Sequence, residues 1–256
     1  MIYSTTNITP NALINGDCLE VMKSIPDKSI DAIICDLPYA VTQNKKDIEL
    51  DKGILWSHYE RIIKDNGAIV LFGQDKFTAR MMLYKEKLHR YNLIWKKGER
   101  TSGFLNANRM PLRNHEDIMV FYKKLPTYNP QMTIGQPLHG KGTSYLEKDC
   151  TNNNYGEFEQ LEDYRKGSTQ KFPKSIIDFD RPHPPIHPTQ KPVDLLEWLI
   201  KTYTNENEVV LDNTMGVGTC PIACARTNRK FIGIELDETY YKIACERVNN
   251  YENETK

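Results

Sequence analysis

The chain has 256 residues, 39% of them hydrophobic, so it can bury a substantial core as one large domain or as one domain with a small insert. Its 34 basic and 34 acidic side chains cancel, which gives no global argument for a nucleic-acid partner. No apolar run approaches the roughly 18 residues of a membrane span, and the start of the chain lacks a signal-peptide pattern. Six cysteines without Cys-x-x-Cys spacing favour a reduced, cytoplasmic chain without structural zinc.

The first predicted elements are a short strand at Leu13 to Asn15 and a helix that begins near Asp17. Asp17 has the residue type and position of a helix N-cap. The apolar run Ala32-Ile33-Ile34-Cys35 then predicts a buried strand, which ends at Asp36. The polar run from Ala40 to Asp47 that follows Tyr39 fits either a mobile loop that closes on DNA or an inert surface loop.

The tetrapeptide Asp36-Leu37-Pro38-Tyr39 places a carboxylate, a carbonyl and an aromatic ring at the end of this strand, where open α/β sheets bind ligands. Because proline has no N–H and favours an extended residue before it, the carbonyl of Leu37 is expected to point outward. Asp36 and that carbonyl can then accept both N–H donors of an amino group, while Tyr39 stacks on a flat heterocycle. A plain Asp-x-Pro turn is the alternative interpretation.

Strands and helices alternate from residue 53 to residue 122, which predicts a mostly parallel sheet with helices on both faces. Helices are predicted at 53–64 and 77–88, and strands at 68–72, 91–95 and 116–122, with Asp65-Asn66-Gly67 stopping the first helix. Residues 85–124 hold ten basic and four acidic side chains, with Phe104 and amide residues among them. This positive segment suits phosphate contacts, although a solvated lysine-rich surface gives the same pattern.

From Pro126 to Pro185 the periodicity fades, which indicates either a base-reading segment or an irregular insert without such a role. A helix follows at Val193 to Tyr203. Val209 to Asp212 then predicts a strand that runs into a glycine turn and a helix, and the next strand ends at Glu235, 23 residues after Asp212. Two glycines followed by an acid at this distance are typical of a site for an adenosine-type cofactor.

Together these residues resemble the β class of amino-group DNA methyltransferases, which use S-adenosylmethionine. The family's catalytic pattern is Asp/Asn/Ser-Pro-Pro-Tyr/Phe, and its cofactor pattern is Asp-x-Phe-x-Gly-x-Gly. This chain has Leu37 in place of the first proline, and Thr214 in place of the phenylalanine between Asp212 and Gly216. The resemblance spans most of residues 13–123 and 186–248.

The resemblance implies roles for individual residues, and a chemistry that needs no metal. Asp36, Leu37, Pro38 and Tyr39 would hold the target amine and base. The expected cofactor contacts are Asp17, Cys18, Thr189, Lys191, Asp212, Gly216, Gly218, Thr219 and Glu235, with Thr189 and Lys191 in a His-Pro-Thr-x-Lys-Pro element that borders the methionine end. The expected DNA contacts are Lys96, Lys97, Arg100, Arg109 and Arg113.

The predicted fold is α/β, a doubly wound, mostly parallel sheet of the Rossmann-like methyltransferase type, with an antiparallel hairpin at one edge and an irregular insert. Residues 1–125 would form the catalytic part, 126–185 a target-recognition insert, and 186–256 the cofactor-binding part. Double-stranded DNA is the expected partner, and a homodimer, as in related enzymes, is an open expectation.

The expected reaction is site-specific transfer of a methyl group from S-adenosylmethionine to N6 of a flipped-out adenine in DNA. N4 of cytosine is the first alternative, although that class usually has Ser in place of Asp36. RNA or a protein amide could use the same amine pocket. A nicotinamide-dependent oxidoreductase fits the glycine turn but lacks the third glycine, and a DNA-binding module without catalysis would not need Asp36 and Tyr39.

Overall fold

The structure is a computed structural model that describes residues 8–39, 50–137, 151–152, 156–157, 167–186 and 189–254. The polar run from Ala40 to Asp47 lies outside the described residues, as do His187 and Pro188. The chain divides into two compact units, the first formed by Met1–Asn129 with Lys174–Lys256 and the second by Pro130–Pro173. No helix in the described ranges is long and apolar enough to cross a membrane.

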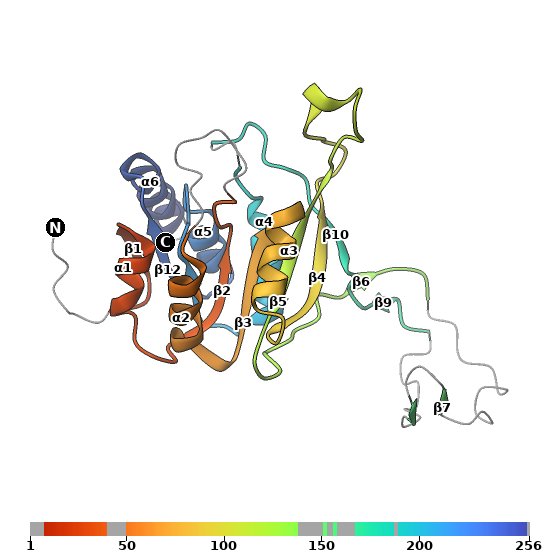
Figure 1. Ribbon diagram of the computed structural model, residues 1–256, viewed down its shortest axis with the longest axis horizontal. Helices are drawn as coiled ribbons and strands as arrows, with labels where there is room; N and C mark the ends of the chain where they lie inside the picture. Colours follow the sequence, from red (N-terminus) through yellow and green to blue (C-terminus); the bar gives the residue numbers. More distant parts are fainter. Residues whose placement is uncertain are drawn as a thin grey trace. The chain divides into compact units, whose positions relative to one another are not determined.

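The first unit is built on an eight-stranded sheet with the order β1-β12-β11-β2-β3-β5-β4-β10 (Figure 1). All neighbouring strands pair in parallel except β5, which runs antiparallel to both β3 and β4. The strands are β1 (Ala12–Asn15), β2 (Ile30–Cys35), β3 (Ile63–Gly73), β4 (His89–Lys96), β5 (His115–Phe121), β10 (Ile176–Asp178), β11 (Val209–Asp212) and β12 (Lys230–Glu235). The predicted doubly wound, mostly parallel α/β fold is confirmed.

Helices cover both faces of this sheet and enclose two separate cores (Figure 1). Along β2, Ile33 and Cys35 pack into one core and Ala32 and Ile34 into the other, because successive side chains of a strand point to opposite faces. The first core receives α1 (Cys18–Val21), α2 (Lys52–Ile62) and α3 (Asp75–Tyr84), and the second receives α4 (Val193–Tyr203), α5 (Thr219–Arg226) and α6 (Glu238–Glu254). Short 3-10 turns occur at Met22–Ser24 and Phe104–Asn106.

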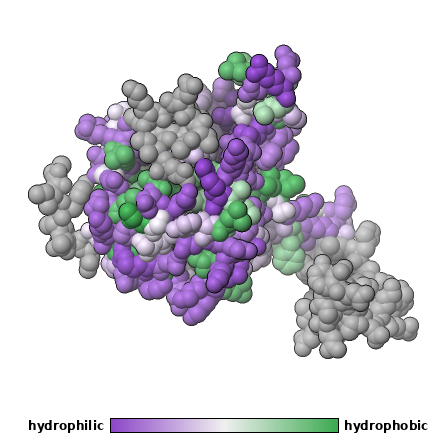
Figure 2. Space-filling model, viewed as in Figure 1, coloured by the Kyte–Doolittle hydropathy of each residue, from purple (hydrophilic) through white to green (hydrophobic). Residues whose placement is uncertain are grey.

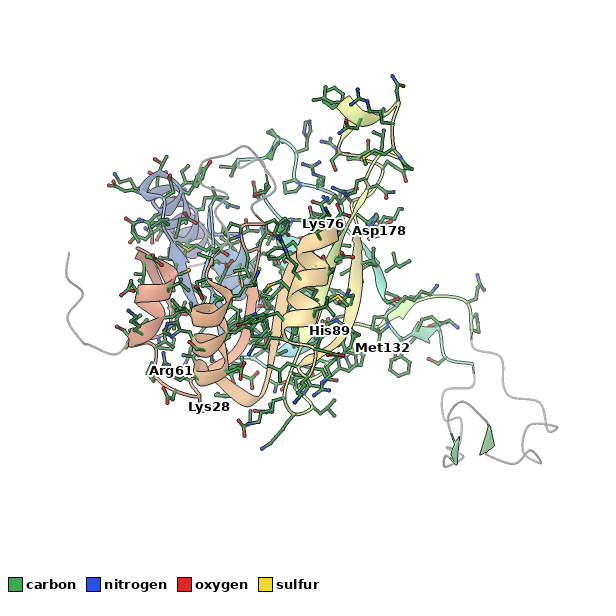
Figure 3. All side chains as sticks on the ribbon, in the orientation of Figure 1. Lys28, Arg61, Lys76, His89, Met132 and Asp178 are labelled. Carbon is green, nitrogen blue, oxygen red and sulfur yellow. The ribbon has the colours of Figure 1, made fainter. Side chains whose placement is uncertain are left out.

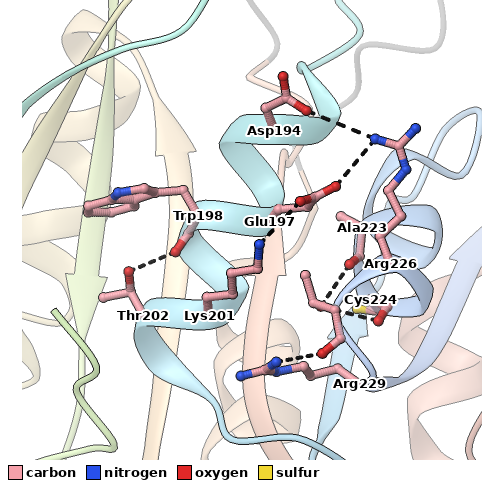
Figure 4. A network of polar contacts seen from close by, with 10 residues as sticks. Asp194, Glu197, Trp198, Lys201, Thr202, Ala223, Cys224, Arg226 and Arg229 are labelled. Carbon is pink, nitrogen blue, oxygen red and sulfur yellow. Dashed lines mark hydrogen bonds and ion pairs between the residues drawn. The ribbon is translucent and has the colours of Figure 1, made fainter. Parts of the chain in front are cut away.

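Helices α4 and α5 are joined by a polar network at their surface, shown in Figure 4. Arg226 lies 3.3 Å from Glu197 and 4.0 Å from Asp194, and Lys201 lies 3.4 Å from Glu197. Exposed ion pairs of this kind contribute about 0–1 kcal/mol each. Burying one leucine side chain contributes about 1.5–3 kcal/mol, so the apolar face of α4 (Leu195, Leu196, Leu199 and Ile200) fixes the helix more strongly than the network does.

The strand predicted at 68–72 begins earlier in the structure. β3 begins at Ile63 and continues through Asp65-Asn66-Gly67, where the sequence predicted the end of a helix. Gly67 therefore does not end helix α2. A Cβ atom on it would lie 2.7 Å from the carbonyl oxygen of Asp31, so this glycine allows close approach of two strands.

The side chain of Arg61 ties α2 to the segment after α1. It donates to the carbonyls of Met22 and Ile25, both at 2.7 Å, at the end of the sheet opposite the β4–β5 connection (Figure 3).

The predicted antiparallel hairpin is formed by β4 and β5, but it is not the edge of the sheet, because β10 pairs outside β4. β10 lies inside the segment 126–185 that the sequence predicted to be an irregular insert. The second unit is shorter than that segment and contains two small antiparallel ladders. They pair β6 (Thr133–Ile134) with β9 (Gln170–Lys171), and β7 (Thr151–Asn152) with β8 (Gly156–Glu157).

Candidate active site at the carboxyl ends of the strands

A cavity of about 940 Å³ opens at the carboxyl ends of the central strands of the first unit. Most of the predicted site residues line it, although they come from segments that are far apart in the sequence. Those that line it are Asp17, Cys18, Asp36, Leu37, Pro38, Tyr39, Lys97, Arg113, Thr189, Lys191, Asp212, Gly216, Thr219 and Glu235. Gly218, Lys96, Arg100 and Arg109 are not among the lining residues.

Asp36 follows the last residue of β2, and each of its oxygen atoms is engaged. The hydroxyl of Tyr39 donates to Oδ1 at 2.7 Å, and the ammonium of Lys191 forms an ion pair with Oδ2. The hydroxyl of Thr214 donates to the backbone carbonyl of Asp36 at 3.0 Å. Burial and the nearby charge of Asp36 raise the pKa of Tyr39, so its hydroxyl stays protonated and acts as a donor.

A row of alternating charges continues inward from Asp36. Lys191 bridges Asp36 and Glu116, lying 3.3 Å from Oε2 of Glu116, and Lys97 pairs with the other oxygen of Glu116. Burial alone would lower the pKa of Lys191, but the two carboxylates outweigh it and raise that pKa. Burial alone would raise the pKa of Glu116, but Lys191 and Lys97 lower it. The pairing therefore favours the ionised form of Glu116 and the charged form of Lys191, whereas burial lowers the pKa of Lys97 despite its pairing with Glu116.

The opposite side of the cavity is formed by the glycine turn between β11 and α5. Gly216 has a φ of +54°, and its N–H donates to Oε2 of Glu235 at 2.9 Å. The N–H of Asp237 donates to Oε1 of the same carboxylate at 2.8 Å. No heavy atom of the described chain lies within 4 Å of where a Cβ on Gly216 would sit, so the turn leaves open space beside the cavity.

Gly218 has a different role, although it belongs to the same motif. Its φ is +78°, and a Cβ there would lie 2.9 Å from the Cβ of Ala244 on α6. This glycine therefore allows α5 and α6 to pack, and it does not line the cavity. Asp17 caps α1 by accepting from the N–H of Leu19 at 2.8 Å, and it also lines the cavity.

Two acids near the turn, the buried Asp212 and the half-buried Glu235, have raised pKa values. Burial raises the pKa of Asp212 from an ordinary value of 3.8 to about 8, despite the hydrogen bond that its carboxylate accepts from the N–H of Thr214. Burial also raises the pKa of Glu235, which the hydrogen bonds from Asp237 and Gly216 only partly offset. On this side of the cavity burial therefore outweighs the hydrogen bonds to both acids, whereas cations outweigh burial at Glu116.

The five basic residues predicted to contact DNA occupy different environments. Lys97 is 6% exposed and pairs with Glu116, so the structure places it inside the charged row instead of on a DNA-facing surface. Lys96 lies 2.7 Å from Asp178, and Arg113 pairs with Asp75. Arg100 and Arg109 are exposed.

Sequence reasoning missed two groups of residues that shape the cavity. The sequence pattern places Glu116 only in a strand, and its position just before the buried run Ile118–Phe121 is the signal for a charge that needs a partner. Behind the cavity, the hydroxyl of Tyr59 donates to Oδ1 of Asn213 at 2.6 Å, and Asn213 in turn lies 3.5 Å from the sulfur of Cys18. Within the described ranges, no three His, Cys, Asp or Glu side chains form a group that could hold a metal ion.

Known proteins are similar to this chain in sequence. Residues 30–246 match the family of N6 and N4 methyltransferases described as DNA methylase. DNA adenine methyltransferase YhdJ of Escherichia coli K12 is 27% identical to this chain, over 93% of this chain and 82% of that protein. Type II methyltransferase M.HpaI of Haemophilus parainfluenzae is also 27% identical, over 93% of this chain and 74% of that protein.

Solved structures share the fold. The M1.HpyAVI–SAM complex superposes with a TM-score of 0.60 at 23% identity and covers 92% of this chain and 98% of that chain. PvuII DNA methyltransferase, described as cytosine-N4-specific, gives a TM-score of 0.64 at 16% identity, over 97% and 93% of the two chains. The family match includes both the Asp36 tetrapeptide and the glycine turn at Gly216, and the chain belongs to the DNA methylase family of N6 and N4 methyltransferases.

Proposed function

We propose that this protein transfers a methyl group from S-adenosyl-L-methionine to N6 of an adenine that has been flipped out of double-stranded DNA. The observation that supports this most directly is a single cavity that joins Asp36 and Tyr39 on one side to Gly216 and Glu235 on the other. An amine and a methyl donor bound on these two sides would lie next to each other, and positioning of this kind supplies much of the rate.

The cavity residues fit an adenosine-type methyl donor. The open space over Gly216 admits a ligand close to the backbone, and the carboxylate of Glu235 is held by two backbone N–H groups at the position where such folds bind ribose hydroxyls. Asp17, Cys18, Asp212, Thr189 and Thr219 are the further proposed contacts. When bound, S-adenosyl-L-methionine supplies a methyl group on a positively charged sulfur, and an amine nitrogen can displace that sulfur.

Asp36 and the carbonyl of Leu37 would accept the two N–H groups of the target amine, and Tyr39 would stack on the base. For this to happen, Asp36 must exchange the hydroxyl of Tyr39 for an N–H of the target, while Lys191 stays paired with its other oxygen. The nitrogen forms its new bond to carbon first, and one N–H proton leaves afterwards through Asp36 to solvent. Lys191 is not a base here, because its neighbours raise its pKa.

Adenine is proposed over cytosine because Asp36 stands where the cytosine enzymes usually have Ser, and because a relative of this chain is named a DNA adenine methyltransferase. The test is mass spectrometry of nucleosides from DNA incubated with the protein and isotopically labelled S-adenosyl-L-methionine. Labelled N6-methyladenine is the expected product, and N4-methylcytosine would transfer the proposal to cytosine. Absence of any labelled nucleoside would refute it. Sequencing of the modified DNA would identify the recognition site.

Exposed basic side chains near the cavity are proposed to bind DNA phosphates, and segment 126–185 is proposed to read bases. Arg100 and Arg109 are the best placed, because both are exposed on the β4–β5 connection. Each phosphate contact steepens the dependence of log affinity on log salt by about 0.9. Alanine at either position should therefore reduce that slope by about one. Alanine at Lys123, which is exposed at the opposite end of β5, is the matched control.

A further inference from the structure

The connection between β4 and β5 forms a projecting hairpin, residues 97–114, whose tip is folded on itself. Its stem is closed by hydrogen bonds between Lys97 N and Asn114 O at 2.8 Å, and between Ser102 and Arg113 in both directions, at 2.7 and 3.1 Å. Gly103, with a φ of +83°, then starts a 3-10 turn, and the N–H of Met110 donates to the carbonyl of Asn106 at 3.0 Å. The tip therefore has its own internal hydrogen bonds and does not rely on neighbouring elements for its shape.

This tip presents large apolar side chains to solvent. Phe104 is 75% exposed, Leu105 is 84% exposed and Met110 is 55% exposed. Figure 2 shows apolar surface at the tip, directly beside hydrophilic surface. Three such side chains within seven residues cost hydration free energy that the fold does not recover, since none of them packs into either core. Clustered exposed apolar side chains of this kind mark a surface that another molecule covers.

The position of the hairpin limits what that molecule can be. Ser102, Gly103 and Arg113, at the base of the tip, line the same cavity as Asp36, so any molecule with a group in the cavity meets the tip. Arg100 and Arg109 flank the apolar side chains and are exposed, which suits a polyanion. Arg113 is held by Asp75 and Lys96 by Asp178, so the stem is anchored to α3 and β10.

We propose that Phe104 and Leu105 form a wedge that enters the base stack and fills the gap left when the target base turns into the cavity. This inference rests on the proposed function. Flipping a base costs unstacking and unpairing free energy, and apolar side chains inserted between base steps offset part of that cost. A phenyl ring is about as thick as the 3.4 Å spacing of stacked bases, so Phe104 can take the place of one base. Arg100 and Arg109 would hold the phosphates on either side.

The experiment compares two duplexes that carry the recognition site found by sequencing. In the first duplex the target base is paired normally, and in the second it faces an abasic site, where little pairing has to be broken. The double variant Phe104→Ala, Leu105→Ala should lose about tenfold or more in kcat/KM on the paired duplex and much less on the abasic one. Leu83→Ala is the matched control, because Leu83 is also 75% exposed but lies on α3. It should match the wild type on both duplexes.

A second readout does not depend on methyl transfer. With 2-aminopurine in place of the target base, wild-type protein should raise the fluorescence as the base leaves the stack, and the double variant should raise it much less. Three results would contradict the proposed wedge. They are an equal loss of activity on both duplexes, no loss on either duplex, and equal fluorescence with the wild type and the variant. Wild-type protein that shows the fluorescence change but methylates neither duplex would instead refute the proposed function. A variant with unchanged DNA behaviour but altered self-association would assign the tip to a protein partner.

Discussion

The two sides of the cavity are built by different means. The side around Asp36 is a row of paired charges in which Lys191 and Lys97 surround Glu116. The side around Gly216 is formed by a backbone turn that leaves open space, and Glu235 is held there by backbone N–H groups. The pKa shifts of the buried acids differ accordingly. The pKa of Glu116 is lowered by its two cations, whereas burial raises the pKa of Asp212 to about 8.

The comparison shows that one side of the cavity depends on paired charges and the other on the shape of the backbone. On the Asp36 side, a half-buried carboxylate must be held in one orientation, and cations from other segments of the chain pair with it and with Glu116. On the Gly216 side, a large ligand must approach the backbone, which requires a positive φ and no side chain. Substitutions on the first side should therefore affect turnover, and substitutions on the second should affect cofactor binding.

The largest expected effect is loss of measurable cofactor binding in Gly216→Val. Valine is strained at a φ of +54°, and its side chain would fill the open space beside the cavity. Isothermal titration calorimetry with S-adenosyl-L-methionine measures this. Wild-type affinity in a folded Gly216→Val protein would remove the turn from the proposed cofactor site.

Gly218→Ala is the companion to that experiment, because the residue belongs to the same motif but faces Ala244. We expect it to lower the free energy of unfolding by about 1–3 kcal/mol through overpacking of α5 against α6. Cofactor affinity of the folded fraction should change little. Denaturant unfolding measures the first effect, and calorimetry measures the second.

The next largest effect is expected for Asp36→Ala, with a fall in kcat of at least about a hundredfold, since it removes a hydrogen bond to the reacting amine. Asp36→Asn retains an acceptor oxygen and should keep part of the activity. Both variants should bind the cofactor like wild type, because the residue lies on the charged side of the cavity. Asp36→Ala protein that turns over at the wild-type rate would show that the tetrapeptide is not the active site.

A smaller effect on turnover is expected for Lys191→Met. This variant tests whether Lys191 acts on Asp36 or contacts the cofactor. The sequence predicted a cofactor contact, whereas the structure pairs Lys191 with Asp36 and Glu116. If orienting Asp36 is its main role, kcat should fall about tenfold with cofactor affinity unchanged. A weaker cofactor affinity with unchanged kcat would support the sequence-based role instead. Lys191→Arg, which keeps the charge, should recover part of the rate.

The last prediction concerns Asp212, where we expect a change in stability with pH and not in turnover. The pKa of Asp212 is about 8 in the folded protein, and its ordinary value is 3.8. Between these two pH values, Asp212 therefore keeps its proton in the folded protein but has lost it in the unfolded chain. The contribution of Asp212 to stability is therefore fully present below about pH 4 and is lost as the pH rises towards 8. Asp212→Asn should stabilise the protein at pH 7.5 relative to the wild type, and it should flatten the dependence of stability on pH across that window. Thermal unfolding at several pH values measures this, and an unchanged pH profile would contradict it.

Much of the fold was predictable from local patterns. The helix at 193–203 and the strands near residues 32–35 and 209–212 were found because apolar residues repeat there with the period of each element. The errors arose where a residue type has two uses. Glycine is typical of turns, but Gly67 allows close packing inside β3. The strand β10 escapes prediction for another reason, because its three residues are too few to show a period within a polar segment.

Part of the candidate site was also predictable. The Asp36 tetrapeptide and the Gly216 turn could be recognised from local sequence, because each is a continuous run whose chemistry depends on neighbouring residues. The pairing of Lys191 with Asp36 and the burial of Lys97 against Glu116 could be seen only in the folded chain. The folded chain also shows that Gly218 serves helix packing while Gly216 borders the cavity. The physical reason is that ion pairing and steric fit depend on distances through space, and those distances are set by how the sheet brings separate segments together.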